Sequence, residues 1–334
     1  MPSMKDVASM AGVSISTVSR VINQTIPVDE QTRSKVLDAI ETLNYRPNLL
    51  AKGLRVKSGQ LIGLILPEIR LHAFVQIINS VEEYVVNRGF SLIIGNTHNV
   101  PDIEEKLLDN LLRRNVDGII FSRLSDESRV LNLIKKSRVK VVAIDRELDV
   151  QDVPHVILDN YGAGVMAANH LISLGHKNIA CITGPLNIKL CRERLAGFSD
   201  TIKKEHLPFE DNQIYEGRFD FDSGFNGAEH FLSQNSGITA FWAQNDLMAI
   251  GALKTLKTHL LNVPDEIAIM GMDNLEISRM VAPALTTIMQ PFDEMSKKAV
   301  EILFDGESES EPQRIILQPG LIVRDSTVLK ESRI

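Results

Sequence analysis

The sequence feature that most constrains the fold is the recurrence of short apolar runs from residue 60 onward. QLIGLILP, VDGIIFS and VKVVAID are each too short for a buried helix and end near Pro, Ser or Asp. Such runs favour β-strands that are buried on both faces. Amphipathic stretches at roughly 74–88, 102–114 and 127–137 lie between the runs and predict helices. Alternating strands and helices predict parallel sheets that are covered by helices on both faces.

The same alternation continues through HVILDN, NIACITGP, ITAFWAQND and IAIMGMDN. A single sheet rarely holds so many strands, so we expect them to be divided between two similar Rossmann-like α/β lobes. In such sheets ligands bind at the carboxyl ends of the strands, and here that place is the cleft between the lobes. The polar residues that end the strands are therefore the first candidates for a binding site.

The distribution of charge points to nucleic acid at one end of the chain. The 334 residues carry a net charge of −7. Residues 1–59 contain eight basic and five acidic residues, a net charge of +3, which leaves −10 on the remainder. A small basic segment on a large acidic body suggests one DNA-facing module.

Three features favour a cytoplasmic protein. No uncharged apolar run is long enough to span a bilayer, and the opening residues, MPSMKDVASM, lack the apolar stretch of a secretory signal. Cys181 and Cys191 fit a reducing compartment. Their spacing matches no metal motif, so we interpret them as small buried hydrophobic residues. We expect no metal and no cofactor.

Residues 1–46 carry the pattern of a small all-α domain. The apolar positions with helical spacing are, in order, Met4, Val7, Ala8 and Ala11, then Val18, Val21 and Ile22, then Val36, Ile40 and Leu43. Ser3 and Asp6 have a spacing like that of a capping box. Gly12 can end the first helix and Ser14 can cap the second. Three short helices with a tight turn after the first predict a helix-turn-helix domain.

The second of these helices has a polar side that suits DNA. Its valines face the small core, which leaves Ile15, Ser16, Thr17, Ser19 and Arg20 on outward or flanking faces. Hydroxyl groups can bond phosphates or bases, Arg20 can donate two bonds to guanine, and Ile15 can pack on a thymine methyl. The same residues also fit an ordinary capped and solvated helix, so this segment alone leaves both interpretations open.

MKDVASMAGVSISTVSRVIN, followed by ETLNYRPNLLAKGLR, resembles the N-terminus of the lactose-repressor (LacI) family of transcriptional regulators. The resemblance runs through essentially the whole chain. The family's DNA contacts fall here on Ile15, Ser16, Thr17, Ser19, Arg20 and Asn23, and on Asn48, Ala51 and Leu54 in a hinge segment at 47–59. By that correspondence Ile15 and Ser16 read bases, and Leu54 wedges into the minor groove and bends the duplex.

For the rest of the chain the resemblance implies a periplasmic-binding-protein-like body. One lobe would comprise residues 60–158 and 290–317, and the other residues 159–289 and 318–330. The effector would lie between the lobes, at a site we expect to include Arg192, Asp273, Asn245 and Phe219, with Phe74, His72 and Asp145 as weaker candidates. Arg192 would donate two bonds to sugar hydroxyls. Each residue also has an ordinary interpretation as a surface, core or helix-start residue, and Arg194 is expected to be structural.

The resemblance leaves the class of effector open. GPL, RLAGF and ALTTIMQP are similar to the purine-repressor branch of the family, but Ile188 and Leu190 stand where that branch has a polar pair. A buried polar group that loses its partner costs about 1–3 kcal/mol, which disfavours a purine, and Arg192 favours the sugar-binding branch. We expect a small sugar, or a sugar phosphate held by Lys189, Arg123 and Arg192. A regulator corepressed by a purine or by a phosphoprotein is the alternative.

The sequence therefore predicts a repressor of a carbohydrate-uptake or catabolism operon. The resemblance implies a homodimer that reads a near-palindromic DNA operator and changes its grip when the effector moves the lobes. The tail, DSTVLKESRI, lacks leucine heptads for a tetramer.

We do not expect an enzyme, because the chain has no P-loop, no dinucleotide glycine pattern, no G-x-S-x-G elbow and no H-E-x-x-H motif. A secreted sugar receptor would share the body, and a head that binds protein would share the helices; we consider both less consistent with the sequence than a DNA-binding regulator.

Overall fold

The computed structural model describes residues 2–23, 26–45, 59–123, 130–148, 153–234, 237–305 and 313–328. The chain divides into two compact units, a head of residues 1–59 and a body of residues 60–334. Within the described residues, no helix is both long enough and apolar enough to cross a bilayer.

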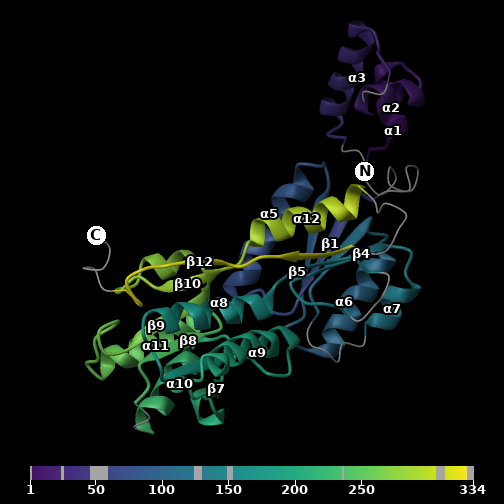
Figure 1. The fold of residues 1–334 in the computed structure, drawn as a ribbon. Helices are drawn as coiled ribbons and strands as arrows, with labels where there is room; N and C mark the ends of the chain where they lie inside the picture. Colours follow the sequence, from purple (N-terminus) through teal and green to yellow (C-terminus); the bar gives the residue numbers. More distant parts are fainter. Residues whose placement is uncertain are drawn as a thin grey trace. The chain divides into compact units, whose positions relative to one another are not determined.

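The described part of the head forms helices α1 (Met4–Ala11), α2 (Ile15–Asn23) and α3 (Glu30–Thr42) (Figure 1). Their buried core consists of Val7, Ala8, Val18, Val21, Val36, Ala39 and Tyr45. Helix α1 opens on a capping box between Ser3 and Asp6 and ends at Gly12, whose φ of 65° is left-handed. This turn lets α2 leave α1 at once, and the predicted helix-turn-helix head is confirmed.

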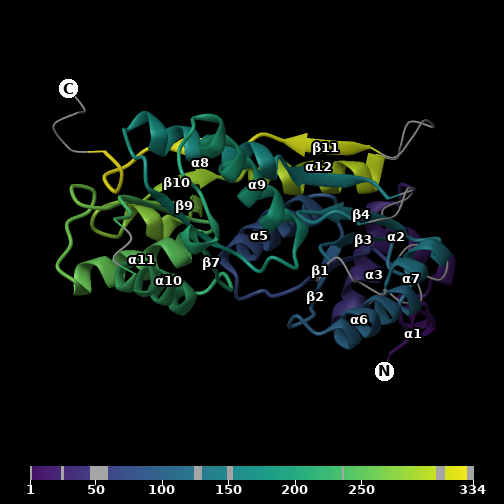
Figure 2. The same cartoon turned by 60° about the horizontal axis from the view of Figure 1, so that its bottom comes forward.

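The first lobe of the body is built on a parallel sheet, which has six strands in the described residues. Its strand order is β11 (Arg314–Leu317), β5 (His155–Leu158), β4 (Lys140–Ile144), β3 (Gly118–Phe121), β1 (Leu61–Leu66) and β2 (Ser91–Asn96). Helices α5 (His72–Val86) and α12 (Phe292–Asp305) cover one face, and α6 (Pro101–Arg113) and α7 (Leu131–Lys136) cover the other (Figure 2). The central strand β3 is wholly buried, as expected of a strand covered on both faces.

The second lobe has the same three layers. Its strand order is β12 (Gly320–Ile322), β10 (Thr286–Met289), β9 (Ala268–Asp273), β8 (Ala240–Ala243), β6 (Ile179–Thr183) and β7 (Ile214–Glu216). Helices α8 (Asn160–Ser173) and α9 (Lys189–Lys204) pack together on one face, and α10 (Phe221–Ser233) and α11 (Asp246–Thr258) pack together on the other. Only β12 runs antiparallel among these described strands.

The two sheets follow the same strand order along the chain. Strands β1, β3, β4 and β5 of the first correspond to β6, β8, β9 and β10 of the second. Strands β4 and β9 are therefore equivalent, and both lead to an aspartate: Asp145 directly follows β4, and Asp273 ends β9. The predicted α/β body with two Rossmann-like lobes is confirmed.

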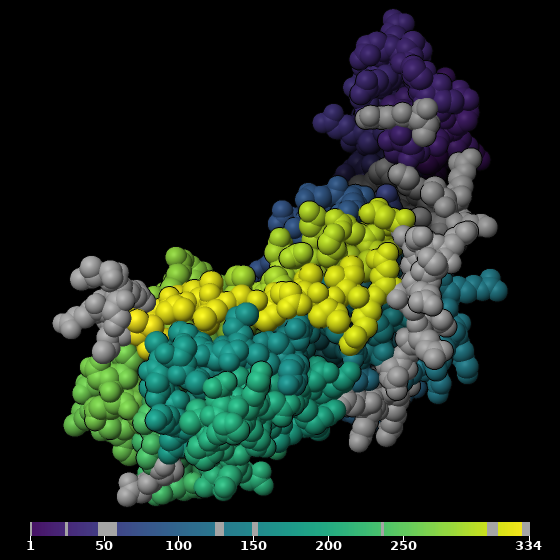
Figure 3. All heavy atoms as spheres, viewed as in Figure 1, coloured from purple at the N-terminus to yellow at the C-terminus, as the bar shows by residue number. Residues whose placement is uncertain are grey.

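The chain crosses from one sheet to the other after strands β5, β10 and β11. It leaves the first sheet after Leu158, returns to it after Met289, and leaves again after Leu317. In Figure 3 the last of these passages is the yellow segment that runs along both lobes. Because β11 and β12 are joined by two residues, the lobes are tied closely at this edge.

Two glycines set the close crossing of α8 and α9. A Cβ on Gly164 would lie 2.0 Å from the carbonyl oxygen of Arg194, and a Cβ on Gly197 would lie 2.1 Å from that of Tyr161. No side chain larger than hydrogen fits at either position without moving the backbone. This crossing fixes the height of α9 above its sheet, and α9 supplies one wall of the cavity described next.

Candidate functional site

Helix α2 of the head exposes the side that the sequence assigned to DNA. Val18 and Val21 are buried, whereas Ile15 is 49% exposed and Ser16 and Arg20 are exposed. A helix with an apolar group, hydroxyls and a guanidinium on its free side can enter a major groove. These groups are therefore accessible to a DNA duplex, and their roles in DNA binding stay predictions.

The hydroxyl groups at the start of α2 bond to one another. Ser14 Oγ accepts from the backbone N–H of Thr17 at 3.1 Å and so caps the helix. The same oxygen lies 2.7 Å from Ser16 Oγ and 2.8 Å from Thr17 Oγ1. At the other end, Asn23 Nδ2 donates to the carbonyl oxygen of Ser19 at 2.8 Å.

The remaining predicted DNA contacts cannot be placed. Asn48, Ala51 and Leu54 lie outside the described residues. Their roles in a hinge helix stay predictions.

A cavity with about 510 Å³ of empty space, part of it open to solvent, lies between the carboxyl ends of the two sheets. Its walls consist of Leu71, His72, Ala73, Phe74, Asp145, Arg146, Leu190, Arg194, Phe219, Gln244, Asn245, Leu247, Asp273, Leu275 and Gln290. The structure therefore brings together every residue predicted for the effector site except Arg192. Small-molecule sites are concave, mainly apolar and fitted with a few convergent polar groups, which describes this cavity.

Two largely buried carboxyl groups face the cavity from equivalent strand ends. Asp145 Oδ2 lies 3.7 Å from Arg146 Nε, and Asp273 Oδ1 accepts from Gln290 Nε2 at 2.6 Å. Burial raises the pKa of Asp145, and burial together with the charge of Asp246 raises the pKa of Asp273. Both aspartates have a positive φ, 65° and 111°. Strain of this kind in non-glycine residues is concentrated at functional sites.

Two arginines oppose these carboxylates. Arg194 is buried, and its Nε donates to Asn160 Oδ1 at 2.8 Å, while its Nη1 donates to the carbonyl oxygen of Gln244 at 3.3 Å. The guanidinium of Arg146 lies 5.8 Å from the centre of the Phe74 ring, a cation–π distance. The cavity thus holds two guanidinium groups and two carboxyl groups and can meet both donors and acceptors on a ligand.

The structure does not place Arg192 among the residues that line the cavity, where the sequence predicted it. Arg192 is exposed, does not line the cavity, and donates from Nη1 to the carbonyl oxygen of Leu186 at 2.8 Å. Positions two apart on a helix point to nearly opposite sides, so Arg192 and Arg194 cannot both face the cavity. Leu190 and Arg194, four apart, share the inward side.

A hydrogen bond from Asn245 holds the backbone of Phe219 in place. Asn245 caps α11 by accepting from the N–H of Met248 at 2.8 Å, and its Nδ2 donates to the carbonyl oxygen of Phe219 at 2.9 Å. Phe219 has a φ of 64°. A Cβ on Gly184 would lie 2.2 Å from Phe219 Cζ, so the ring occupies space that only glycine leaves. Asn245 therefore orients an aromatic wall of the cavity.

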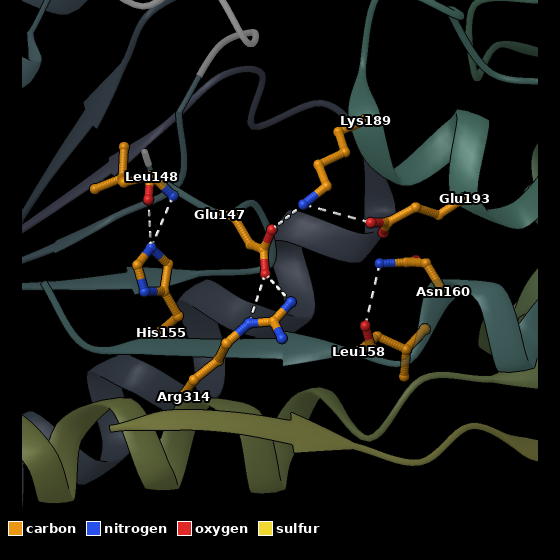
Figure 4. Close-up of polar contacts among 8 residues, drawn as sticks. All are labelled: Glu147, Leu148, His155, Leu158, Asn160, Lys189, Glu193 and Arg314. Carbon is orange, nitrogen blue, oxygen red and sulfur yellow. Dashed lines mark hydrogen bonds and ion pairs between the residues drawn. The ribbon is translucent and has the colours of Figure 1, made fainter. Parts of the chain in front are cut away.

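A second chamber of about 330 Å³ adjoins the cavity and shares Asp145, Arg146 and Leu190 with it. Glu147 stands at its wall and receives hydrogen bonds from Lys189 and Arg314, as Figure 4 shows. Lys189 Nζ also lies 3.5 Å from Glu193 Oε1. This cluster joins residues of both lobes beside the ligand space.

Four polar lining residues escaped the sequence prediction: Arg146, Arg194, Gln244 and Gln290. Gln244 directly follows β8 and Arg146 is the second residue after β4, so the strand-end rule could have included them. Arg194 needed the register of α9, and Gln290 needed the path of the chain between lobes. Within the described residues, no group of three or more His, Cys, Asp or Glu could hold a metal ion.

Comparison with known proteins covers both units. Residues 3–48 match bacterial regulatory proteins of the lacI family, and residues 59–324 match periplasmic binding proteins and the sugar binding domain of the LacI family. The transcriptional repressor PurR of Actinobacillus pleuropneumoniae serotype 3 is 37% identical over 331 residues, which are 98% of this chain and 98% of that protein.

Two solved structures extend the similarity to three dimensions. A lac repressor dimer bound to operator and the anti-inducer ONPF matches with a TM-score of 0.89 and 30% identity, over 98% of this chain and 99% of that one. The complex of the transcriptional regulator CelR with cellobiose matches with a TM-score of 0.73 and 28% identity, over 98% and 100%.

Proposed function

Because the chain belongs to the LacI family of DNA-binding transcriptional repressors, we propose that a small ligand in its cavity sets how tightly the head holds an operator. The observation that carries the proposal is a single cavity lined by strand-end residues of both lobes, such as Asp145 and Asp273. A ligand that touches both lobes favours one arrangement of them, and this difference in affinity is what can shift a coupled DNA site.

The head supports operator recognition through α2. Ile15, Ser16 and Arg20 are exposed on a helix whose other side is anchored by Val18 and Val21. The anchoring fixes which side chains can reach base edges, while exposed cations such as Arg20 can also attract the phosphate backbone. We propose that Ile15, Ser16 and Arg20 supply the sequence preference.

The chemistry of the cavity favours a small polyhydroxylated ligand, such as a sugar. A hydroxyl group donates to a carboxylate and accepts from a guanidinium at the same time. Asp273 and Arg194 offer both partners within one cavity, and the ring of Phe219 offers an apolar face. The regulated genes would then be those for uptake or breakdown of that sugar. The cellobiose complex of CelR, a 28% identical neighbour, supports this class of ligand.

A purine is the second candidate. It is favoured by the name PurR of a 37% identical relative and by the two phenyl rings, Phe74 and Phe219, that line the cavity. Against it stand the aliphatic side chains of Leu190, which lines the cavity from α9, and of Ile188, which lines the adjoining chamber. A purine edge facing these groups would leave polar atoms without partners, at a cost of about 1–3 kcal/mol each.

A homodimer is proposed on two grounds. The lac repressor neighbour is a dimer on its operator. In this chain, the edge strand β2 carries Ile94 exposed, and an open groove between α5 and residues 274–280 is lined by Val75, Ile277 and Met280, all exposed. An apolar sheet edge and an apolar groove call for cover by another chain.

Two measurements test the proposed function. Full-length protein is first used to select binding sites from random duplex DNA, with Arg20→Met as the control variant. We expect near-palindromic sites for the unaltered protein and weak or no enrichment for the variant. No enrichment by the unaltered protein would refute operator recognition.

The effector class is tested by thermal shift with neutral sugars, sugar phosphates and purine bases. A ligand of the folded cavity raises the Tm by mass action. We expect sugars to raise the Tm of the unaltered protein and to have little effect on Asp273→Asn. A shift with hypoxanthine or guanine alone would establish the purine candidate instead.

A further inference from the structure

We propose that Glu147 and Lys189 form a latch between the two lobes that favours the closed cavity; its regulatory consequence rests on the function proposed above. Glu147 lies in the loop after β4 in the first lobe, and Lys189 is the first residue of α9 in the second. Lys189 Nζ donates to Glu147 Oε2 (Figure 4). This ion pair therefore connects a loop of one lobe directly to a helix of the other.

The carboxylate of Glu147 is held in place from its own lobe. Arg314 Nε donates to Glu147 Oε1 at 2.8 Å, and Arg314 opens β11, which pairs with β5 of the same sheet. One carboxylate oxygen is thus fixed to the first lobe while the other is presented to the second. Burial opposes ionisation of Glu147, but the hydrogen bonds from Lys189 and Arg314 outweigh it and hold its pKa below the ordinary value.

The N-terminus of helix α9 favours a negative charge that its own first turn does not provide. Its N-terminus carries the positive end of the helix dipole, where Lys189 is unfavourable. The N-cap residue Ile188 offers no side-chain cap, and the first turn, which the structure describes in full, contains no acidic residue. Glu193, one turn further, lies 3.5 Å from Lys189. Glu147 brings the missing negative charge to this helix end from the opposite lobe.

The latch adjoins the ligand space. Glu147 and Lys189 both line the second chamber, which continues into the main cavity past Asp145 and Leu190. The same helix that carries Lys189 also carries Arg194 into the cavity. Separation of the ion pair would free the start of α9 to move away from the first lobe, which would widen the gap between Arg194 and Asp145.

The strength of the latch follows from its exposure. The side chain of Lys189 is 43% exposed and that of Glu147 is 20% exposed, so water and salt partly screen the pair. Ion pairs at such sites change an equilibrium by a factor of about two to five. The latch is therefore strong enough to tune the balance of open and closed lobes, and weak enough for a ligand to override it.

The test measures the distance between the lobes in full-length protein without ligand. Spin labels are placed at Lys136→Cys on α7 and Lys254→Cys on α11, both exposed positions, while native Cys181 and Cys191 are buried and do not react. Labelled subunits are diluted with unlabelled ones so that distances arise within one chain. We expect Glu147→Gln and Lys189→Met each to raise the population with a long distance by about two- to fivefold.

Three further measurements separate a latch from a general loosening of the fold. The double variant should open no more than either single variant, because both remove the same interaction. Glu193→Gln, which removes only the contact within α9, should leave the distances unchanged. High salt should open the unaltered protein but not the Lys189→Met variant. Unchanged distances in both single variants, or additive opening in the double variant, would overturn the latch.

The regulatory consequence is read from operator affinity. With an operator obtained by selection, and with no small molecule present, both single variants should change Kd by the factor found for the distances. Equal operator Kd values despite altered distances would refute the regulatory role. If the unaltered protein prefers no operator over random duplex, the proposed function fails, and the distances still decide whether the latch exists.

Discussion

We expect Arg194 to bind the ligand and Arg192, two residues earlier on α9, not to contact it. Arg194 is buried in the cavity wall, and Arg192 is exposed and bonded to the backbone of Leu186. We expect Arg194→Met to abolish the thermal shift by a sugar and Arg192→Met to leave it nearly intact. Isothermal titration with that sugar provides the affinities. Equal losses in the two variants would contradict the placement of Arg194.

Asp246 gives the body a measurable dependence on pH. Its carboxylate accepts from Ser278 Oγ at 2.6 Å, Thr287 Oγ1 at 2.6 Å and the N–H of Leu275 at 2.8 Å. Burial nevertheless raises its pKa to about 6. The folded protein then binds this proton more tightly than the unfolded chain, so the stability contributed by the group falls as the pH rises from about 4 to about 6.

Urea unfolding of the unaltered protein and of Asp246→Asn checks this sign. Relative to the variant, the unaltered protein should lose up to about 3 kcal/mol between pH 4 and pH 6. The variant provides the baseline for all other titrating groups. A stability difference that stays constant over this range would show that Asp246 has an ordinary pKa.

At the level of single residues, the sequence predicted those lining residues of the cavity that stand at the ends of strands. Asp145 and Asp273 follow apolar runs that proved to be β4 and β9, so their meeting in one cavity followed from the parallel-sheet rule. Arg194 was expected to be structural, and its position in the cavity wall depends on the register of α9, which the sequence alone does not define. The pairing of Glu147 with Lys189 joins residues 42 positions apart across two lobes, which no local pattern encodes.

Among the elements, the α8–α9 crossing is the most sensitive support of the site. A Cβ on Gly164 would press on the backbone of Arg194, the very residue that lines the cavity. Gly164→Ala should therefore cost about 1–3 kcal/mol of stability and displace α9.

Thermal unfolding and ligand titration of Gly164→Ala give the two readouts, with Ser173→Ala on the exposed side of α8 as the control. We expect a lower Tm and weaker ligand binding in the glycine variant only. Normal stability of Gly164→Ala would mean that the two helices can separate without cost.

Helix boundaries were predicted with varying success. The stretch predicted at 102–114 is α6, Pro101–Arg113, and the one at 74–88 is α5, His72–Val86, because strong amphipathic periodicity outlines both. The stretch predicted at 127–137 contains the shorter α7, Leu131–Lys136, and its first residues lie outside the described ones. Periodicity locates a helix well but fixes its ends poorly, since caps and tertiary contacts decide them.

For the whole molecule, the exposed apolar groove predicts the assembly. Met280 is 66% exposed and shares the groove with Val75 and Ile277. Met280→Asp should shift the protein from dimer to monomer and weaken operator binding, because one head reads only half of a palindrome. Sedimentation velocity measures the assembly. Leu260→Asp, which alters another exposed apolar residue, should remain dimeric. A dimeric Met280→Asp variant would move the interface elsewhere.

The central claim is that ligand binding in the cavity changes the affinity of the head for operator DNA. Fluorescence anisotropy with a selected operator, with and without the ligand that raises the Tm, measures that coupling directly. The unaltered protein should change its operator Kd by about 5- to 150-fold, and Arg194→Met should show no change. A ligand that stabilises the unaltered protein yet leaves its operator Kd the same would contradict the claim.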